Sequence, residues 1–172
     1  MIYLLSKETT CCFTGHRVSR LPWRNNESDP RCIQLKNTLY DAVEAVYHSG
    51  IRHYICGMAT GSDLFFCEAV IALRSAHPGI TLEAAIPCPE QAQRWPESLQ
   101  KRYLSLLSQC DFYTLVSKQY TADCMLRRNH YMVDQSSVLI AVYNGTANPR
   151  SGTCSTLLYA IRQGTEIIEI TP

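Results

Sequence analysis

Three short segments of the chain carry residues that could bind a phosphate group. The first contains Gly15, His16 and Arg17, directly after a run of β-forming residues. Glycine lets the backbone turn sharply or approach a ligand, and arginine can donate two parallel hydrogen bonds to a phosphate. Histidine adds a further donor, or an acid or base near neutral pH. An ordinary turn followed by two solvated side chains would explain the same residues, so this segment alone decides nothing.

The second segment, residues 57–63, reads Gly-Met-Ala-Thr-Gly-Ser-Asp. Its small residues should leave the first amide groups of the following helix bare, and such amides attract anions. Asp63 would repel a phosphate, but it could cap the helix or bind a ribose hydroxyl. A plain tight turn is the alternative. The spacing matches neither G-x-G-x-x-G nor a P-loop, which argues against a standard NAD(P) dehydrogenase and a P-loop NTPase.

The third segment, Ser151, Gly152 and Thr153, follows a loop rich in Asn, Gly and Pro. It opens a predicted helix, so its hydroxyl and amide groups could surround a phosphate, with Gly152 allowing close approach. Ser and Thr are also common at ordinary helix N-caps, and that alternative stays open.

The elements that would position these segments alternate between short β-rich runs and longer stretches with helical spacing. We predict strands at residues 10–14, 51–56, 80–86, 112–116, 138–142 and 167–170, with amphipathic or buried helices between them. This pattern indicates one Rossmann-like α/β domain over residues 1–172, with a mostly parallel sheet of about six strands and helices on both faces. Ligands bind at the carboxyl ends of such strands, where all three segments should meet.

Composition narrows the class of protein. The chain has 172 residues, 46% of them hydrophobic and 18% charged, and a formal net charge of +1, which gives no global bias toward nucleic acid or anionic membrane. No apolar run approaches the ~20 residues of a membrane span, so we expect a cytoplasmic protein with no membrane partner. The nine cysteines lack a C-x-x-C spacing. We expect most to be small buried residues in a reducing compartment, and we expect no metal site.

The combined motifs resemble the YpsA-like family of the SLOG superfamily, which includes the DNA-processing DprA proteins and the LOG enzymes. The segments that carry the resemblance are residues 12–17, 57–63, 128–132, 138–143 and 151–153, together with Pro87, Gln91 and Trp95. The resemblance covers nearly the whole chain.

This resemblance implies a Rossmann-like protein that binds a nucleotide or an NAD-, ADP-ribose- or AMP-like ligand, with a sensing or regulatory role. No obligatory cofactor follows from it, the expected partner is a small-molecule nucleotide, and a homodimer is left open. Trp95 either packs in the core or helps to form a base pocket. The implied ligand-binding residues are Gly15, His16, Arg17, Gly57, Ala59, Thr60, Gly61, Asp63, Gln91, Trp95, Arg128, Asn129, Ser151, Gly152 and Thr153.

The LOG branch suggests an alternative, a phosphoribohydrolase that cleaves the N-glycosidic bond of a nucleotide. Arg128 stands where that family has its arginine, and Gly152-Thr153 match its G-T pair, but Thr156 replaces the glutamate and Asn129 a lysine. Glycosidic cleavage needs a carboxylate or an equivalent group, which Thr does not provide. Asp63 or Glu90 could supply one, so Arg128 and Asp63 are the candidate catalytic residues, and catalysis itself is left open.

The DprA branch suggests a second alternative, single-stranded DNA binding. Residues 57–63 resemble the G-x-A-x-G-x-D turn of that branch. A basic patch with an aromatic stacking platform would be needed, and one could form in the first loop. Its members would be Arg17, Arg20, Arg24 and Arg31, with Trp23 between them. Charged, solvated loop residues explain the same pattern, so we do not expect nucleic acid to be the partner.

Overall fold

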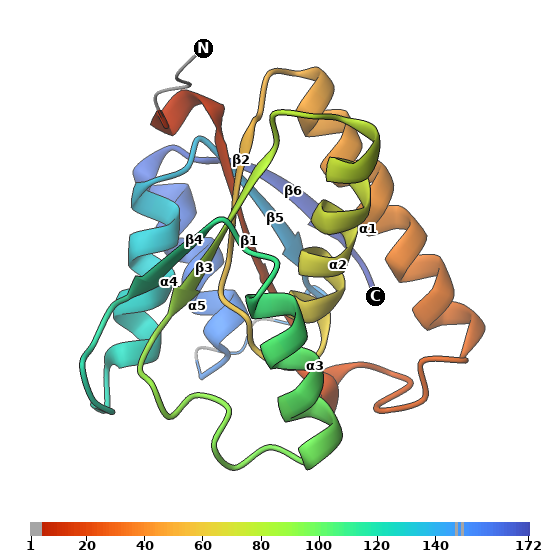
Figure 1. The fold of residues 1–172 in the computed structure, drawn as a ribbon, viewed down its shortest axis with the longest axis vertical. Helices are drawn as coiled ribbons and strands as arrows, with labels where there is room; N and C mark the ends of the chain where they lie inside the picture. Colours follow the sequence, from red (N-terminus) through yellow and green to blue (C-terminus); the bar gives the residue numbers. More distant parts are fainter. Residues whose placement is uncertain (1–4, 147, 149) are drawn as a thin grey trace.

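A parallel six-stranded sheet forms the centre of the protein (Figure 1). The computed structural model describes residues 5–146, 148 and 150–172. Within them the strand order is β4-β3-β2-β1-β5-β6, and each neighbouring pair is parallel. The strands are β1 (Thr10–Gly15), β2 (His53–Cys56), β3 (Thr81–Ile86), β4 (Phe112–Leu115), β5 (Val138–Val142) and β6 (Glu166–Ile170). This topology confirms the predicted Rossmann-like α/β class.

Helices cover both faces of the sheet, as the alternating pattern predicted. Helices α1, α2 and α3 lie on one face, and α4 and α5 pack together on the other (Figure 1). Their bounds are α1 (Pro30–His48), α2 (Ser62–Ala76), α3 (Glu97–Leu107), α4 (Cys124–Asp134) and α5 (Gly152–Gln163). Two single 3-10 turns, η1 (Lys7–Thr9) and η2 (Val18–Arg20), flank β1.

Local sequence explains where the helices begin and end. Helix α1 starts at Pro30, whose missing N–H costs nothing at the first helical position, and the Asp29 carboxylate accepts the Arg31 N–H. Helix α5 ends before Gly164, which has a φ of 71° in the left-handed region that glycine tolerates. Helix α3 starts only at Glu97, because Pro96 stands at its N-cap, so Trp95 lies just before the helix.

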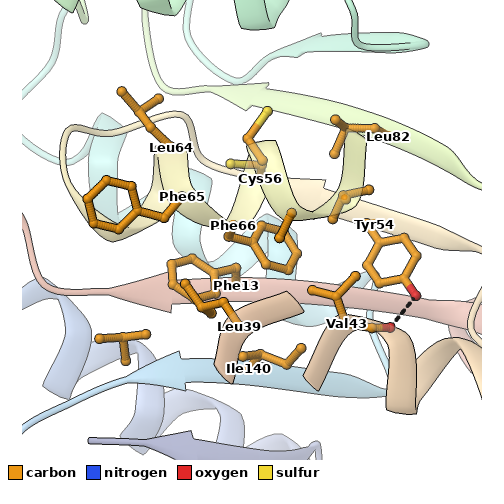
Figure 2. Packing of buried hydrophobic residues seen from close by; sticks show 14 of the residues in the cluster. Phe13, Leu39, Val43, Tyr54, Cys56, Leu64, Phe65, Phe66, Leu82 and Ile140 are labelled. Atoms are coloured by element: carbon orange, nitrogen blue, oxygen red, sulfur yellow. Dashed lines mark hydrogen bonds between the residues drawn. The ribbon is translucent and has the colours of Figure 1, made fainter. Parts of the chain in front are cut away.

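The larger core fills the space between α1, α2 and the sheet (Figure 2). Phe13 of β1 stacks on Phe66 of α2, with ring centroids 4.7 Å apart. The Tyr54 hydroxyl donates to the Val43 carbonyl oxygen over 2.9 Å, so this buried polar group is satisfied (Figure 2). Helix α2 is buried at most of its positions because it packs on strands β1, β2 and β3 and is flanked by α1 and α3, which explains its nearly continuous apolar sequence.

Most cysteines are buried residues of the core, as the sequence predicted. All nine are free, and eight of them are buried. Among the described residues, no helix has both the length and the apolar character needed to cross a membrane.

Candidate functional site

A polar cavity of about 310 Å³ opens between β1 and β5, where the order of the strands in the sheet reverses. Strand β1 pairs with β2 on one side and with β5 on the other, so the connections that leave β1 and β5 diverge and leave a crevice at the carboxyl ends of these two strands. The cavity is lined by Phe13, Thr14, Gly15, His16, Arg17, Ser19, Arg20, Ala59, Asp63, Arg128, Asn129, Met132, Arg150, Ser151, Gly152 and Thr153. All three sequence segments therefore contribute to one cavity.

Arg128 is the most buried cation of this cavity, with 4% of its surface exposed. Its Nη1 donates to the carbonyl oxygen of Gly57 and, over 3.3 Å, to that of Ala85, while its Nε donates to Asn129 Oδ1 over 2.8 Å. Among the described residues, Nη2 donates only to the weak acceptor Met125 Sδ, at 3.8 Å, so it keeps donor capacity for a ligand. Burial lowers the pKa of the Arg128 guanidinium, although Asp63 acts in the opposite direction.

Gly57 is what allows Arg128 to occupy this position. A Cβ atom added at Gly57 would lie 2.6 Å from Arg128 Nη1 and 2.8 Å from its Cζ. A real Cβ atom essentially never lies this close to another side chain, so any larger residue would displace the guanidinium. The small residue in this turn therefore serves the close approach of a side chain.

Asp63 places a single buried carboxylate in the wall of the cavity. Its Oδ2 accepts the Ala59 N–H over 3.0 Å, and Gly61 takes the N-cap position of α2 that we had considered for Asp63. Burial raises the pKa of the Asp63 carboxyl, while the charges of Arg128 and Arg17 oppose this shift. Such a carboxylate can accept a ribose hydroxyl or exchange a proton with a ligand.

His16 is held as a neutral imidazole with one unused donor. Its ring is 2% exposed, and its Nε2 accepts the Asn144 N–H over 3.2 Å, which assigns the proton to Nδ1. Nδ1 is buried and has no hydrogen-bond partner among the described residues. Burial lowers the pKa of His16, so the ring is uncharged at neutral pH.

The loop after β1 packs directly against the start of α2. Gly61 has a φ of 84°, and an added Cβ would lie 2.7 Å from the Val18 backbone nitrogen. The Ser62 N–H and hydroxyl both donate to the His16 carbonyl oxygen, at 3.2 and 2.8 Å. Two of the amides around this helix start are therefore engaged instead of bare: the Ser62 N–H donates to His16, and the Ala59 N–H donates to Asp63.

The start of α5 leaves backbone amides free beside the cavity. The Ser151 hydroxyl accepts the Cys154 N–H over 3.4 Å as an N-cap, and the N–H groups of Gly152 and Thr153 make no hydrogen bond within the described part of the chain. A Cβ added at Gly152 would meet only Asn129 Nδ2, at 4.0 Å. Free space therefore lies against the positive end of this helix.

Comparison with protein families identifies the family of the chain. The family model YpsA, described as the YspA SLOG family, matches residues 11–171. The chain belongs to the YpsA family. The match spans the sheet from β1 to β6 and confirms the resemblance that the motifs carried.

Relatives of this YpsA-family chain include proteins from bacteria. A UPF0398 protein of Halalkalibacterium halodurans is 30% identical over 112 residues, which are 64% of this chain and 59% of that protein. The uncharacterized SPbeta prophage-derived protein YoqJ of Bacillus subtilis is 29% identical over 145 residues, covering 77% of this chain and 83% of YoqJ. The chain thus spans less than two thirds of the UPF0398 protein.

A solved structure shares the fold. DNA processing protein A from Helicobacter pylori aligns with a TM-score of 0.60 and 15% sequence identity, over 95% of this chain and 65% of that chain. That structure is described as giving insights into a unique single-stranded DNA binding mode. At this identity, the likeness supports the Rossmann-like fold of this YpsA-family chain.

Five of the residues predicted for the site do not line the main cavity, and four of these five lie around it. Gly57 and Gln91 support Arg128: Gln91 Nε2 donates to the carbonyl oxygens of Gly57 and Met58 at 3.2 and 3.1 Å, and its Oε1 accepts from Arg128 at 3.3 Å. Gly61 packs on the β1 loop, as described above. Thr60 lines a second cavity of about 550 Å³, formed by Arg17, Val18, Ser19, Arg24, Asn25, Thr60, Pro96 and Leu99.

Trp95 and Trp23 take structural positions. The Trp95 ring packs edge-on against Tyr103, with centroids 5.4 Å apart, and belongs to neither cavity in the described part of the chain. Trp23 is 4% exposed, so it is a core residue and cannot be the stacking platform of the proposed DNA patch. Arg31 forms an ion pair with Asp29 at 2.7 Å. Trp23 and Arg31 are therefore two of the five residues of the proposed DNA patch that have other structural partners.

Two arginines that line the cavity, Arg20 and Arg150, were not among the residues predicted to bind the ligand. Arg20 lies three residues after Arg17 in η2, a turn that brings both onto the cavity wall. Arg150 directly precedes the N-cap Ser151, and its position one residue before a predicted phosphate-binding helix start was the available signal. Glu90 is exposed and does not line this cavity, and the Thr156 hydroxyl donates to the Gly152 carbonyl oxygen over 2.7 Å.

Proposed function

We propose that the protein binds a phosphorylated, nucleotide-derived ligand of the AMP, ADP-ribose or NAD type in the main cavity. One observation carries this proposal. The cavity between β1 and β5, where the strand order reverses, combines several arginines with the free amides at the N-terminus of α5. The cations are Arg17, Arg20, Arg128 and Arg150. Planar guanidinium groups and helix amides both recognise phosphate oxygens, and both are directed at the same space.

The remaining polar groups suit the sugar part of such a ligand. Asp63 is the single carboxylate of the cavity wall, and a carboxylate surrounded by arginines accepts hydroxyl hydrogens without excluding a nearby phosphate. The His16 Nδ1–H offers a neutral donor. The cavity volume of about 310 Å³ lies at the lower end of the range of ligand pockets, roughly 300–1,000 Å³, and suits a mononucleotide portion.

A longer ligand could continue into the second cavity. Arg17 and Ser19 line both cavities, and the second has an apolar surface from Val18, Pro96 and Leu99. A polar compartment joined to an apolar one matches a ligand with a phosphate group at one end and a base at the other. This arrangement favours ADP-ribose or NAD over AMP.

Binding with a sensing role fits the cavity better than LOG-type hydrolysis. Arg128 Nη1 is engaged by backbone carbonyl groups, Thr156 is bonded within α5, and Asp63 is the one carboxylate among the described cavity residues that could assist glycosidic cleavage. If the protein does hydrolyse AMP, Asp63→Asn should remove the activity and keep the binding. Release of the free base from AMP, followed by chromatography, distinguishes these cases.

Single-stranded DNA is the second candidate ligand. The apolar second cavity is flanked by Arg17 and Arg24, which could follow a phosphate backbone. The structural likeness to a DNA processing protein described through its single-stranded DNA binding mode also speaks against our expectation that nucleic acid is not a partner. DNA binding should weaken steeply with salt, whereas nucleotide binding in a partly enclosed cavity should change much less.

Calorimetric titration of the purified protein with AMP, ADP-ribose, NAD and a short oligodeoxynucleotide tests the proposal. We expect one nucleotide to bind, and Arg17→Ala to weaken that binding by about tenfold or more, because hydrogen bonds to charged groups contribute roughly 1.5–3 kcal/mol. Arg31→Ala is the matched control, since Arg31 is an exposed arginine outside the cavity. Binding of the oligonucleotide alone, with strong salt dependence, would replace nucleotide binding by the second candidate.

A further inference from the structure

Three potential metal ligands meet at the end of the molecule opposite the candidate cavity. Glu44 and His48 stand four residues apart on α1 and therefore share one face of that helix. His77 is the C-cap residue of α2, which packs along α1. The C-terminal ends of these two helices lie side by side at the top of Figure 1, whereas the carboxyl ends of the strands lie at the bottom.

The separations between these side chains fit a small divalent cation. One ligand atom from each of the three residues lies within 4.8 Å of the others, and Glu44 Oε1 is 3.5 Å from His77 Nε2. In tetrahedral zinc sites, metal–ligand distances of about 2.0–2.2 Å place neighbouring donor atoms roughly 3.3–3.5 Å apart. The Glu44–His77 pair already has this spacing, and a rotamer adjustment of the exposed His48 side chain would complete the set.

The surroundings hold two of the ligands in place. The Tyr47 ring packs on the His77 ring with centroids 4.5 Å apart, and the His48 and His77 rings meet edge to face at 5.7 Å. Arg52, which stacks on Tyr47 at 4.1 Å, donates to the backbone carbonyl oxygens of Tyr47 and Ile51. The Arg52 guanidinium is therefore held by hydrogen bonds to the backbone. The Glu44 and His77 side chains are 37% and 25% exposed, which leaves access for an ion and for a water ligand.

We propose that Glu44, His48 and His77 form a binding site for a divalent ion of the Zn²⁺ class. Two imidazoles and one carboxylate favour Zn²⁺, Co²⁺ or Ni²⁺ over Mg²⁺ and Ca²⁺, which prefer oxygen ligands. Water would take the fourth position. Because the ligands come from two helices, the ion would cross-link the ends of α1 and α2 and stabilise the folded chain. This site departs from our expectation that the protein has none.

Titration of Zn²⁺ into the tag-free full-length protein, under reducing conditions, tests this site. We expect one equivalent to bind and to raise the melting temperature. Glu44→Gln, His48→Ala and His77→Ala should each weaken binding by roughly tenfold or more, because even groups that only orient metal ligands contribute 10- to 100-fold. His130→Ala is the control, since His130 lies on α4, on the other face of the sheet.

Replacement by Co²⁺ separates this site from binding to the cysteines. The proposed ligands predict visible d–d absorption without a thiolate charge-transfer band, and this absorption should be lost in His77→Ala. Failure to bind Zn²⁺, a thiolate band, or equal binding by the three variants and the His130→Ala control would each overturn the proposal.

Discussion

At the scale of single residues, the candidate site depends on side chains whose charge and position are set by burial. Arg128 approaches the backbone of Gly57 only because no Cβ stands there, and His16 is neutral because its ring is enclosed. The residue types were visible in the sequence. The position of Arg128 and the charge of His16 were not visible, because burial and hydrogen-bond partners depend on segments that are distant in the chain.

Two glycine substitutions should separate stability from binding. Gly57→Ala would force the Arg128 guanidinium away, since the added Cβ would lie 2.6 Å from Nη1, and we expect a loss of about 1–3 kcal/mol in the free energy of unfolding together with weaker ligand binding. Gly152→Ala meets nothing closer than 4.0 Å, so stability should be nearly unchanged, while a ligand at the α5 N-terminus would be obstructed. Urea unfolding and calorimetric titration of both variants measure the two effects. A stable Gly57→Ala protein with normal binding would contradict the role given to Arg128.

His16 should make stability depend on pH. Its pKa is lowered in the folded state by burial, so the unfolded chain takes up the proton more readily. The stabilising contribution of the neutral ring is therefore present above the unfolded pKa of about 6.5 and is lost as the pH falls below it. We expect His16→Gln to flatten the decrease in the free energy of unfolding as the pH falls below about 6.5. Parallel curves for His16→Gln and the wild type would show that His16 does not titrate differently on folding.

At the scale of elements, a buried polar network connects three strands and a helix. Glu83 of β3 lies 2.8 Å from His53 Nε2 on β2, and it accepts hydrogen bonds from Thr114 of β4 at 2.7 Å and Tyr131 of α4 at 2.6 Å. Burial acts to raise the pKa of Glu83, but the hydrogen bonds from His53, Tyr131 and Thr114 outweigh it and hold this pKa below its usual value.

Removal of the Glu83 carboxylate should lower the free energy of unfolding. Glu83→Ala would leave the buried His53 Nε2 and the half-buried Tyr131 hydroxyl without their partner, so we expect a loss of roughly 3–5 kcal/mol in the free energy of unfolding. Glu97→Ala breaks an exposed pair with Lys101 on α3, whose side chains are 80% and 74% exposed, and it should cost no more than about 0.5 kcal/mol. Chemical denaturation of the two variants compares them directly. Similar losses would mean that the network around Glu83 contributes little.

Most elements could be predicted from the sequence, because their apolar spacing is local. Strand β5 is buried along its whole length, as its continuous apolar run indicated. The start of α3, the engaged amides before α2 and the membership of Arg150 in the cavity were missed. Pro96 sets the start of α3, and the Ser62 amide is engaged by His16, which is distant in the sequence and therefore outside any spacing rule.

At the scale of the whole molecule, the two ends of the sheet have different chemistry. The carboxyl ends of β1 and β5 open into an arginine-lined cavity, and the opposite end presents the cluster of Glu44, His48 and His77. Helix α2 connects the two ends, because Asp63 lies in its first turn and His77 at its C-cap. The reversal of strand order at β1 explains why the cavity forms there, and this could be expected once the parallel sheet was predicted.

A crystal structure of the protein with the nucleotide that binds most tightly in the titrations tests the central proposal most directly. We expect a phosphate group within hydrogen-bond distance of the Gly152 and Thr153 amides and of Arg17, with a ribose hydroxyl close to Asp63. A nucleotide bound elsewhere, with the cavity between β1 and β5 filled only by water, would contradict the proposal.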